Sequence, residues 1–263
     1  MDRHAITINT LRDLKARGEP ATCVALYDAP LAAAAERAGV EILLVGDSLA
    51  MTVQGRSSTL PATMEQMVYH TEAVARGSAT ALIIADMPFM SYASVPTACE
   101  NAGALMRAGA HMVKLEGGAW LAPTIATLRD NGVPCCVHLG LTPQSVHLLG
   151  GYKVRGRGAE GERILDDMIA LDAVGAACML LECVPLPLAE RAAQRLAAPV
   201  IGIGAGAADA QVLVANDLLG ITANPPKFSH NFLADAGGVE AAFAAFVAAV
   251  KERQFPQPVH CFK

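Results

Sequence analysis

Short apolar runs alternate along the chain with longer segments in which apolar residues recur at helical spacing. Glycine or proline bounds most of these runs, which favours strands buried on both faces of a parallel sheet. Eight strands are expected on this basis. They cover residues 21–27, 42–45, 82–85, 112–116, 134–139, 177–181, 199–203 and 218–222.

The segments between the strands predict helices, and many of them end at a glycine, as helices commonly do. These helices cover residues 6–18, 31–38, 61–76, 95–108, 121–131, 160–174, 188–196, 208–215 and 239–253. Regular alternation of strand and helix predicts an α/β fold, a single (β/α)8 TIM barrel with an N-terminal helix. No linker divides the chain, so we expect one domain over residues 1–263. The pattern is least regular in residues 208–222.

Three consecutive predicted strands end in a carboxylate, at Asp47, Asp86 and Glu116. The C-terminal strand ends of a barrel meet at one pocket, so these side chains would converge there. One such residue could be a helix N-cap, but three in succession favour a shared cation, because buried carboxylates need partners. Mg²⁺ usually takes one or two carboxylates directly. We therefore expect Asp47 and Asp86 to bind it directly, and Glu116 to bind it directly or through water.

Three more side chains are expected at this pocket. Lys114 lies two residues before Glu116 and points the same way, so it could bind a substrate carboxylate or an oxyanion, or simply form an ion pair. Glu182 ends an almost wholly apolar run, where desolvation would make it a proton acceptor near neutral pH. The alternative is a carboxylate satisfied by backbone donors. His138 could polarise an oxygen, move a proton or be a hydrogen-bonded core histidine.

Two glycine-rich segments have less specific signals. Residues 202–206, Gly-Ile-Gly-Ala-Gly, follow the seventh strand, where barrels often bind phosphate, but a tight turn is the simpler interpretation. Residues 150–158 are rich in glycine and basic residues. They could form a mobile lid, an anion contact or a solvated surface loop.

Composition excludes several classes of protein. Hydrophobic residues make up 53% of the chain and charged residues 17%, which predicts a large core. A net charge of −5 gives no basic footprint for nucleic acid and no polybasic segment for a membrane. No apolar stretch approaches the roughly 20 residues of a spanning helix, and residues 1–5 lack a signal-peptide layout. Seven cysteines without a CxxC pair indicate a reducing compartment, so we expect a cytoplasmic protein.

The segments around these candidates resemble a known family. They read Val-Gly-Asp-Ser-Leu (45–49), Met-Thr-Val-Gln-Gly (51–55), Ala-Asp-Met-Pro-Phe (85–89), Arg-Ala-Gly-Ala (107–110), Val-Lys-Leu-Glu-Gly-Gly (113–118), His-Leu-Gly-Leu-Thr-Pro-Gln (138–144), Gly-Gly-Tyr-Lys-Val (150–154), Leu-Glu-Cys-Val-Pro (181–185) and Ile-Gly-Ile-Gly-Ala-Gly (201–206). In this order, from about residue 22 to residue 232, they closely resemble the ketopantoate hydroxymethyltransferase family. The resemblance implies a barrel of the phosphoenolpyruvate/pyruvate type.

The resemblance also implies a site and a reaction. The implied Mg²⁺ ligands are Asp47, Asp86 and Glu116. The implied contacts to an α-keto acid are Asp47, Ser48, Asp86 and Lys114, with His138 in a less defined role, and the implied base is Glu182. The implied reaction transfers a hydroxymethyl group from 5,10-methylenetetrahydrofolate to 3-methyl-2-oxobutanoate and gives 2-dehydropantoate (ketopantoate), the precursor of pantothenate and coenzyme A. The implied assembly is a large homo-oligomer such as a decamer.

Two stretches depart from the family pattern. Residues 207–210, Ala-Ala-Asp-Ala, are slightly shorter than the family's usual stretch. Residues 223–226, Ala-Asn-Pro-Pro, replace a glycine-rich turn and are also shorter. Both lie in the seventh and eighth units, where they would alter pterin or subunit contacts and leave the metal residues untouched.

Two other functions fit part of the pattern. One is a Mg²⁺-dependent C–C lyase or mutase of the isocitrate lyase type acting on a 2-oxo acid. The Lys-Lys-Cys-Gly-His motif of such lyases is absent from this chain. The other is a barrel that has lost catalysis and serves as an assembly protein. The joint presence of three carboxylates, Lys114 and Glu182 argues against it, and failure of the protein to bind Mg²⁺ would favour it.

Overall fold

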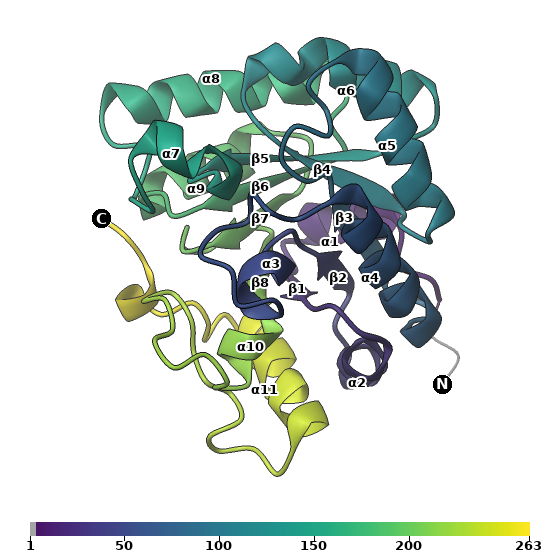
Figure 1. Ribbon diagram of the computed structural model, residues 1–263. Coiled ribbons are helices and arrows are strands. Elements are labelled where there is room, and N and C mark those ends of the chain that lie inside the picture. The colour runs from purple at the N-terminus through teal and green to yellow at the C-terminus, as the bar shows by residue number, and fades with distance from the viewer. Residues whose placement is uncertain (1–3) are drawn as a thin grey trace.

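The protein forms a closed barrel of eight parallel strands that follow one another around the ring in chain order (Figure 1). The structure is a computed structural model that describes residues 4–263. Its strands are β1 (Ala21–Ala25), β2 (Ile42–Val45), β3 (Leu82–Asp86), β4 (Met112–Glu116), β5 (Cys135–Gly140), β6 (Cys178–Glu182), β7 (Val200–Ile203) and β8 (Ala210–Val214). The predicted (β/α)8 architecture is therefore confirmed.

The helices surround the barrel, and side-chain caps explain where several of them begin. They are α1 (Ile8–Arg17), α2 (Ala29–Ala38), α3 (Leu49–Thr52), α4 (Met64–Gly77), α5 (Val95–Arg107), α6 (Ala122–Asp130), α7 (Val146–Leu149), α8 (Ala159–Ala173), α9 (Leu186–Arg195), α10 (Ala215–Leu218) and α11 (Val239–Lys251). Short 3-10 turns cover η1 (Ala119–Leu121), η2 (Pro143–Ser145) and η3 (Pro258–His260). The side chains of Asp28, Thr63 and Ser94 accept backbone hydrogen bonds at the starts of α2, α4 and α5.

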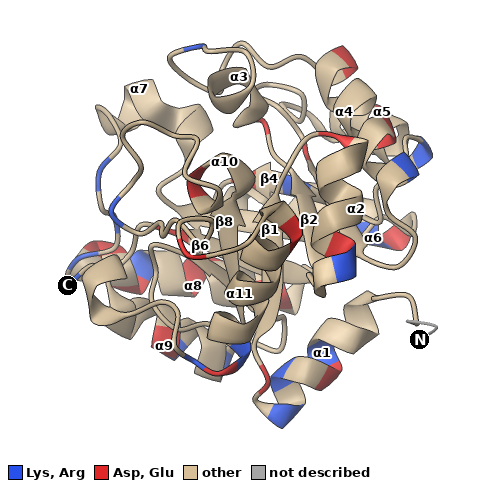
Figure 2. Cartoon of the chain, turned by 90° about the horizontal axis from the view of Figure 1, so that it is seen from below, with Lys and Arg blue, Asp and Glu red and all other residues tan. Residues whose placement is uncertain are grey.

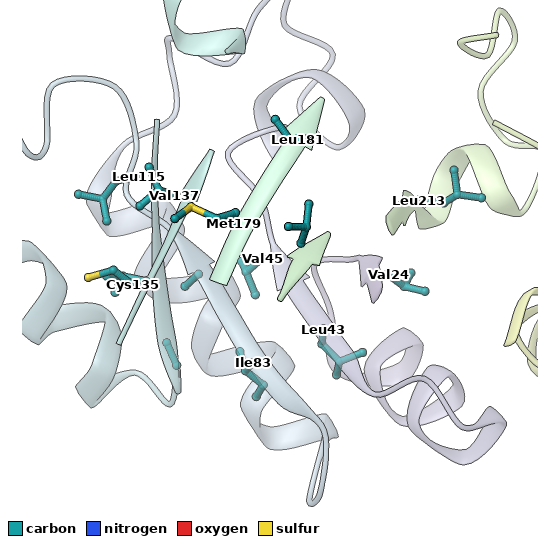
Figure 3. Packing of buried hydrophobic residues seen from close by; sticks show 14 of the residues in the cluster. Val24, Leu43, Val45, Ile83, Leu115, Cys135, Val137, Met179, Leu181 and Leu213 are labelled. Carbon is teal, nitrogen blue, oxygen red and sulfur yellow. The ribbon is translucent and has the colours of Figure 1, made fainter. Parts of the chain in front are cut away.

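The alternating directions of strand side chains divide the core into two clusters. Residues such as Val24, Leu43 and Val45 point outward and pack beneath the surrounding helices, as Figure 3 shows. Their neighbours Cys23 and Ile42 belong to the inner cluster, which fills the barrel. The inner series continues at every second residue to the strand ends. It therefore directs the last polar residues of β3 to β6 into the mouth of the barrel.

Helix α1 closes the opposite end of the barrel. Leu11 and Leu14 are buried and join the inner cluster. The ammonium of Lys15 donates hydrogen bonds to the carbonyl oxygen of Ala193, at 2.8 Å, and to Oδ2 of Asp209, at 2.7 Å. The predicted N-terminal helix is thus a plug for the N-terminal ends of the strands.

The sequence interpretation was wrong in the eighth unit. We expected a helix over residues 208–215 and a strand over residues 218–222, whereas β8 spans Ala210–Val214 and the short helix α10 follows it. Residues 210–214 pair with β1 along their whole length and also with β7. This pairing closes the barrel, and it outweighs the preference of the neighbouring alanines for a helix. A turn joins β7 directly to β8, and its Gly204 and Gly206 have φ of 60° and 81°. The simpler interpretation of residues 202–206, a tight turn, therefore describes this segment.

Two further expectations concern membranes and thiols. Within residues 4–263, no helix combines the length and apolar character needed to cross a membrane. All seven cysteines are free thiols.

Candidate active site

A cavity of about 800 Å³ opens at the C-terminal end of the barrel. All the candidate side chains from the sequence line it, namely Asp47, Ser48, Asp86, Lys114, Glu116, His138 and Glu182. They come from the ends of β2 to β6 or from the turn just after β2. The expectation that these scattered positions would share one pocket is confirmed.

The turn after β2 brings two aspartates together. The backbone N–H of Asp47 donates to Oδ2 of Asp86 over 3.1 Å, so the second carboxylate helps to fix the first residue. A Cβ at Gly46 would lie 2.7 Å from Oγ of Ser48, so a larger residue there would displace the Ser48 hydroxyl. Oγ of Ser48 lies 2.8 Å from the Tyr27 hydroxyl, which holds it at the edge of the cavity.

Lys114 is the cation at the centre of this group. Its Nζ lies 3.1 Å from Oδ2 of Asp86 and 3.8 Å from Oε1 of Glu116, and its side chain is only 4% exposed. Burial alone would lower the pKa of Lys114, but the surrounding carboxylates of Asp86, Glu116 and Asp47 outweigh burial and raise it. The residue is therefore held as an ammonium beside the acidic groups.

The carboxylates differ in how well they are compensated. Burial, followed by repulsion from Asp86 and Glu116, raises the pKa of Asp47 well above its ordinary value. Burial also raises the pKa of Asp86, although Lys114 opposes this effect. For Glu116, burial is outweighed by His138 and Lys114, and its pKa is lowered. Of the three carboxylates, Asp47 is therefore the one whose charged form its surroundings compensate least.

His138 lies between two carboxylates. Its Nδ1 is 3.3 Å from Oε1 of Glu116, and its Nε2 is 3.4 Å from Oε2 of Glu182. Both pairs of atoms are close enough for an ion pair, but neither pair has the geometry of a hydrogen bond. Burial and the neighbouring Lys114 lower the pKa of His138, but the two carboxylates outweigh them and raise it to about 9. His138 therefore links the acidic cluster to Glu182.

Glu182 differs from its predicted surroundings. The apolar setting expected from the sequence is wrong for the carboxylate itself, because the side chain is 17% exposed and His138 faces it. The alternation of β6 explains the difference, since Leu181 points into the outer cluster while Glu182 lines the cavity. Glu182 can thus receive a proton from a molecule in the cavity.

The donor set fits a hard divalent cation. Oδ1 of Asp86 and Oε1 of Glu116 are buried without a hydrogen-bond partner, and Asp47 lies beside both residues. Within residues 4–263, however, no three His, Cys, Asp or Glu side chains are arranged to hold a metal ion by themselves. These facts fit a site with two direct carboxylates that water and substrate oxygens complete. Metal binding by Asp47, Asp86 and Glu116 stays a prediction.

The sequence interpretation missed Gln144, which connects the two sides of the acidic cluster. Its backbone N–H donates to Oε2 of Glu116 at a distance of 2.9 Å. Its side-chain Nε2 donates to Oδ2 of Asp47 and to the carbonyl oxygen of Met87, both also at a distance of 2.9 Å. The Tyr92 hydroxyl donates in turn to Oε1 of Gln144. The only available signal was its place at the end of the segment 138–144.

The basic loop after β5 contributes to the cavity wall. Tyr152 and Lys153 line the mouth, and the Tyr152 hydroxyl lies 3.6 Å from Sδ of Met51 on the opposite rim. Arg155 instead forms an ion pair with Glu160. Of the basic residues in this loop, Lys153 is therefore the one placed to meet an anion in the cavity.

A comparison with known families accounts for this arrangement. A family model described as ketopantoate hydroxymethyltransferase matches residues 5–258. The chain belongs to the ketopantoate hydroxymethyltransferase family. The resemblance that the motifs indicated is thereby confirmed.

Curated members of the ketopantoate hydroxymethyltransferase family match nearly the whole chain. A relative from Saccharophagus degradans is 55% identical over 259 residues, which are 98% of this chain and 96% of the relative. A relative from Marinobacter nauticus is also 55% identical, over 262 residues that cover 98% of this chain and 99% of the relative. Both are named 3-methyl-2-oxobutanoate hydroxymethyltransferase.

Solved structures relate this ketopantoate hydroxymethyltransferase family member to a wider group of barrels. Phosphoenolpyruvate phosphomutase from Streptomyces platensis has a TM-score of 0.62 at 17% identity, covering 83% of this chain and 84% of that one. Phosphonopyruvate hydrolase in complex with oxalate and Mg²⁺ has a TM-score of 0.59 at 12% identity, covering 79% and 80%. At these identities the likeness shows the fold alone, and it agrees with the (β/α)8 barrel described above.

Proposed function

We propose that the protein transfers a hydroxymethyl group from 5,10-methylenetetrahydrofolate to 3-methyl-2-oxobutanoate and forms 2-dehydropantoate, with Mg²⁺ as its cofactor. One observation carries the proposal. A buried ammonium, Lys114, lies among three carboxylates in the cavity that Glu182 also lines. This arrangement can bind a keto acid, stabilise negative charge on its oxygen and remove a proton from the adjacent carbon. The names of the close relatives support the same reaction.

The α-keto acid would bind between Ser48 and Lys114. The Ser48 hydroxyl can donate to the substrate carboxylate, and the Lys114 ammonium can donate to the keto oxygen. Asp47 and Asp86 would hold the metal, and Glu116 would hold it directly or through water. When bound, Mg²⁺ supplies Lewis-acid polarisation of the carbonyl group. We assign these roles from the charge and placement of the side chains.

Glu182 would act as the base. It would take the proton from C3, the carbon next to the carbonyl, and become a carboxylic acid. The electron pair of the broken C–H bond moves toward the keto oxygen, where the Lys114 ammonium stabilises the negative charge. His138, 3.4 Å from Glu182, would keep that carboxylate oriented toward the substrate.

Water would add to the methylene carbon of the folate donor, and both C–N bonds of that carbon would break, so that tetrahydrofolate leaves and the one-carbon unit remains as formaldehyde. The enolate carbon C3 would then bond to the formaldehyde carbon while the C=O π bond breaks, and the oxygen would take the proton held by Glu182 and become the hydroxyl group of the product. Glu182 would be neutral only while it holds the proton, and the charge of the Lys114 ammonium would stay in place throughout. Placement of charges before the reaction is the main source of stabilisation in such a site.

The base can be tested without the folate donor. With Mg²⁺ in D₂O, we expect the protein to exchange the C3 proton of 3-methyl-2-oxobutanoate. Glu182→Gln should slow this exchange about 10²–10⁴-fold while Mg²⁺ binding is retained. The matched control is Glu190→Gln, on the exposed surface of α9, which should exchange at the wild-type rate. Exchange in Glu182→Gln at the wild-type rate would remove this residue as the base.

We also propose a setting for the enzyme. Its seven free cysteines suit a reducing compartment, which supports the expected cytoplasmic location. A homo-oligomer such as a decamer remains our expectation for the assembly, and sedimentation velocity measures it directly. The expected partners are the two small-molecule substrates, without nucleic acid or membrane.

A further inference from the structure

The cavity is much larger than the keto acid requires. Pockets of roughly 300–1,000 Å³ enclose drug-sized ligands, and this cavity has about 800 Å³. The residues assigned to the keto acid and the metal lie at the ends of β2 to β6. The remaining wall, called here the second half, comes from β8, α10, residues 221–228 and Phe262, and from the loops after β2 and β5, which include Arg56, Tyr152 and Lys153. This second half has no role in the steps described so far, and the cavity as a whole leaves room for a second ligand beside the keto acid.

A buried carboxylate lies in the wall of the second half. Asp217, on α10, is 7% exposed and lines the cavity. Its Oδ1 accepts a hydrogen bond from the Thr222 hydroxyl over 2.5 Å. In the described part of the chain, Thr222 is the one group that hydrogen-bonds to this carboxylate, and no Lys or Arg lies within ion-pair distance of it. A buried carboxylate with so few partners is costly unless a ligand donates to it.

The rings around the second half suit a flat aromatic ligand. Tyr152 is 47% exposed and lines the mouth together with Phe228 and Phe262. Exposed aromatic faces at a cavity offer stacking surfaces for a planar ring system. The Lys227 ammonium lies 5.2 Å from the centre of the Phe262 ring and donates to the carbonyl oxygen of Cys261, so the C-terminal segment is fixed there.

Two exposed residues that line the cavity carry positive charge. Arg56, in the loop after α3, and Lys153, in the loop after α7, both line the cavity and are exposed. Figure 2 shows basic segments on the loops beside α3 and α7. Neither side chain has an ion-pair partner among residues 4–263. The second half therefore offers a buried carboxylate, aromatic rings and two exposed cations to a ligand in the cavity.

We propose that Asp217 binds the pterin ring of the folate donor, with the folate tail passing between Arg56 and Lys153. This inference rests on the proposed function, which supplies the class of ligand. A pterin has two adjacent N–H donors, at N3 and at the 2-amino group, and one carboxylate can accept from both. Tyr152 contributes a stacking face, and the glutamate carboxylates of the tail meet the two cations. The carboxylate binds the ring and takes no part in the proton transfer.

The first experiment measures ring recognition in the wild-type protein and the Asp217→Asn variant. Binding of 6-methyltetrahydropterin is compared with binding of its 2-deamino analogue by isothermal titration calorimetry. Because a charge-assisted hydrogen bond is lost, the wild type should bind the 2-deamino analogue about tenfold or more weakly. Asp217→Asn should bind the two ligands with similar affinity. Equal affinities in the wild type would overturn the proposal, and that result needs no variant to fold.

The second experiment separates folate binding from the rest of the reaction. Asp217→Asn should raise the KM for methylenetetrahydrofolate about tenfold or more, and the loss should fall on this KM rather than on exchange of the keto acid's C3 proton. Asp235→Asn, an exposed carboxylate outside the cavity, is the matched control and should keep the wild-type KM. A wild-type folate KM in a folded Asp217→Asn variant would overturn the inference.

The two proposals fail in different ways. If the wild type forms no 2-dehydropantoate yet discriminates between the two pterins through Asp217, the proposed reaction is wrong and the pterin site stands. If it forms 2-dehydropantoate with no dependence on Asp217, the reaction stands and the site is wrong.

Discussion

At its N-terminal end the barrel is filled with apolar side chains and closed by α1, whereas at its C-terminal end the same strands present charged side chains to a cavity. The change from apolar interior to charged cavity takes place within β4. Met112 belongs to the inner apolar cluster, and Lys114, two residues later, lies among carboxylates. The closed end can bury apolar area, and the open end keeps charges that folding alone does not favour. Stability and chemistry are therefore separated along the barrel axis.

Among the substitutions that compare the two ends, the largest expected effect comes from Lys114→Met at the open end. This substitution removes the cation that faces the developing negative charge, and we expect kcat/KM to fall about 10²–10³-fold. Steady-state measurement of 2-dehydropantoate formation gives the value. Lys15→Met, which removes a partly buried lysine at the closed end, is the matched control and should keep activity within about twofold. A loss below about tenfold in Lys114→Met would contradict the separation of the two ends.

Leu14→Ala tests the closed end. Leu14 is buried between α1 and the barrel interior, so we expect the free energy of unfolding to fall by about 2–3 kcal/mol. The activity at 25 °C should stay near that of the wild type, because no group at the cavity changes. Urea unfolding followed by circular dichroism measures the stability. Leu148→Ala, at a side chain that is 89% exposed, should change it by less than about 0.5 kcal/mol.

Gln144→Leu gives the smallest expected effect and sharpens the comparison within the open end. The substitution keeps the approximate size of the side chain but removes the donor to Asp47, so the carboxylate is less well oriented. We expect about 10-fold weaker Mg²⁺ binding, measured by calorimetry, since residues behind a metal ligand commonly contribute this much. Gln194→Leu, on an exposed part of α9, should leave Mg²⁺ binding unchanged. Equal affinities in both variants would show that Gln144 does not position the metal ligands.

Much of the site could be predicted because it depends on local periodicity. Lys114 and Glu116 share a direction since strand side chains repeat every second residue, and barrel topology places neighbouring strand ends together. The setting of Glu182 could not be read in the same way. Its sequence neighbours are apolar, but they point into the outer cluster, and the residue that faces it, His138, comes from another strand.

The eighth unit and Gln144 show where local patterns fail. The run that forms β8 contains residues suited to both helix and strand, and its pairing with β1 decides the outcome. The importance of Gln144 depends on contacts with Asp47 and Met87, which lie on different strand ends. Asp217 was missed because the last unit was misplaced. The sequence interpretation put this residue between a helix and a strand, whereas it lies on α10, which follows β8.

The pairing of β8 with β1 has a consequence during synthesis of the chain. The first strand, Ala21–Ala25, finds its second partner only when Ala210–Val214 has left the ribosome. Until then the nascent sheet has two open edges, on β1 and on β7, that could pair with other chains. Contacts between such distant segments also slow folding. A product truncated before Ala210 would keep both edges open, and we expect it to aggregate rather than accumulate as a partial barrel.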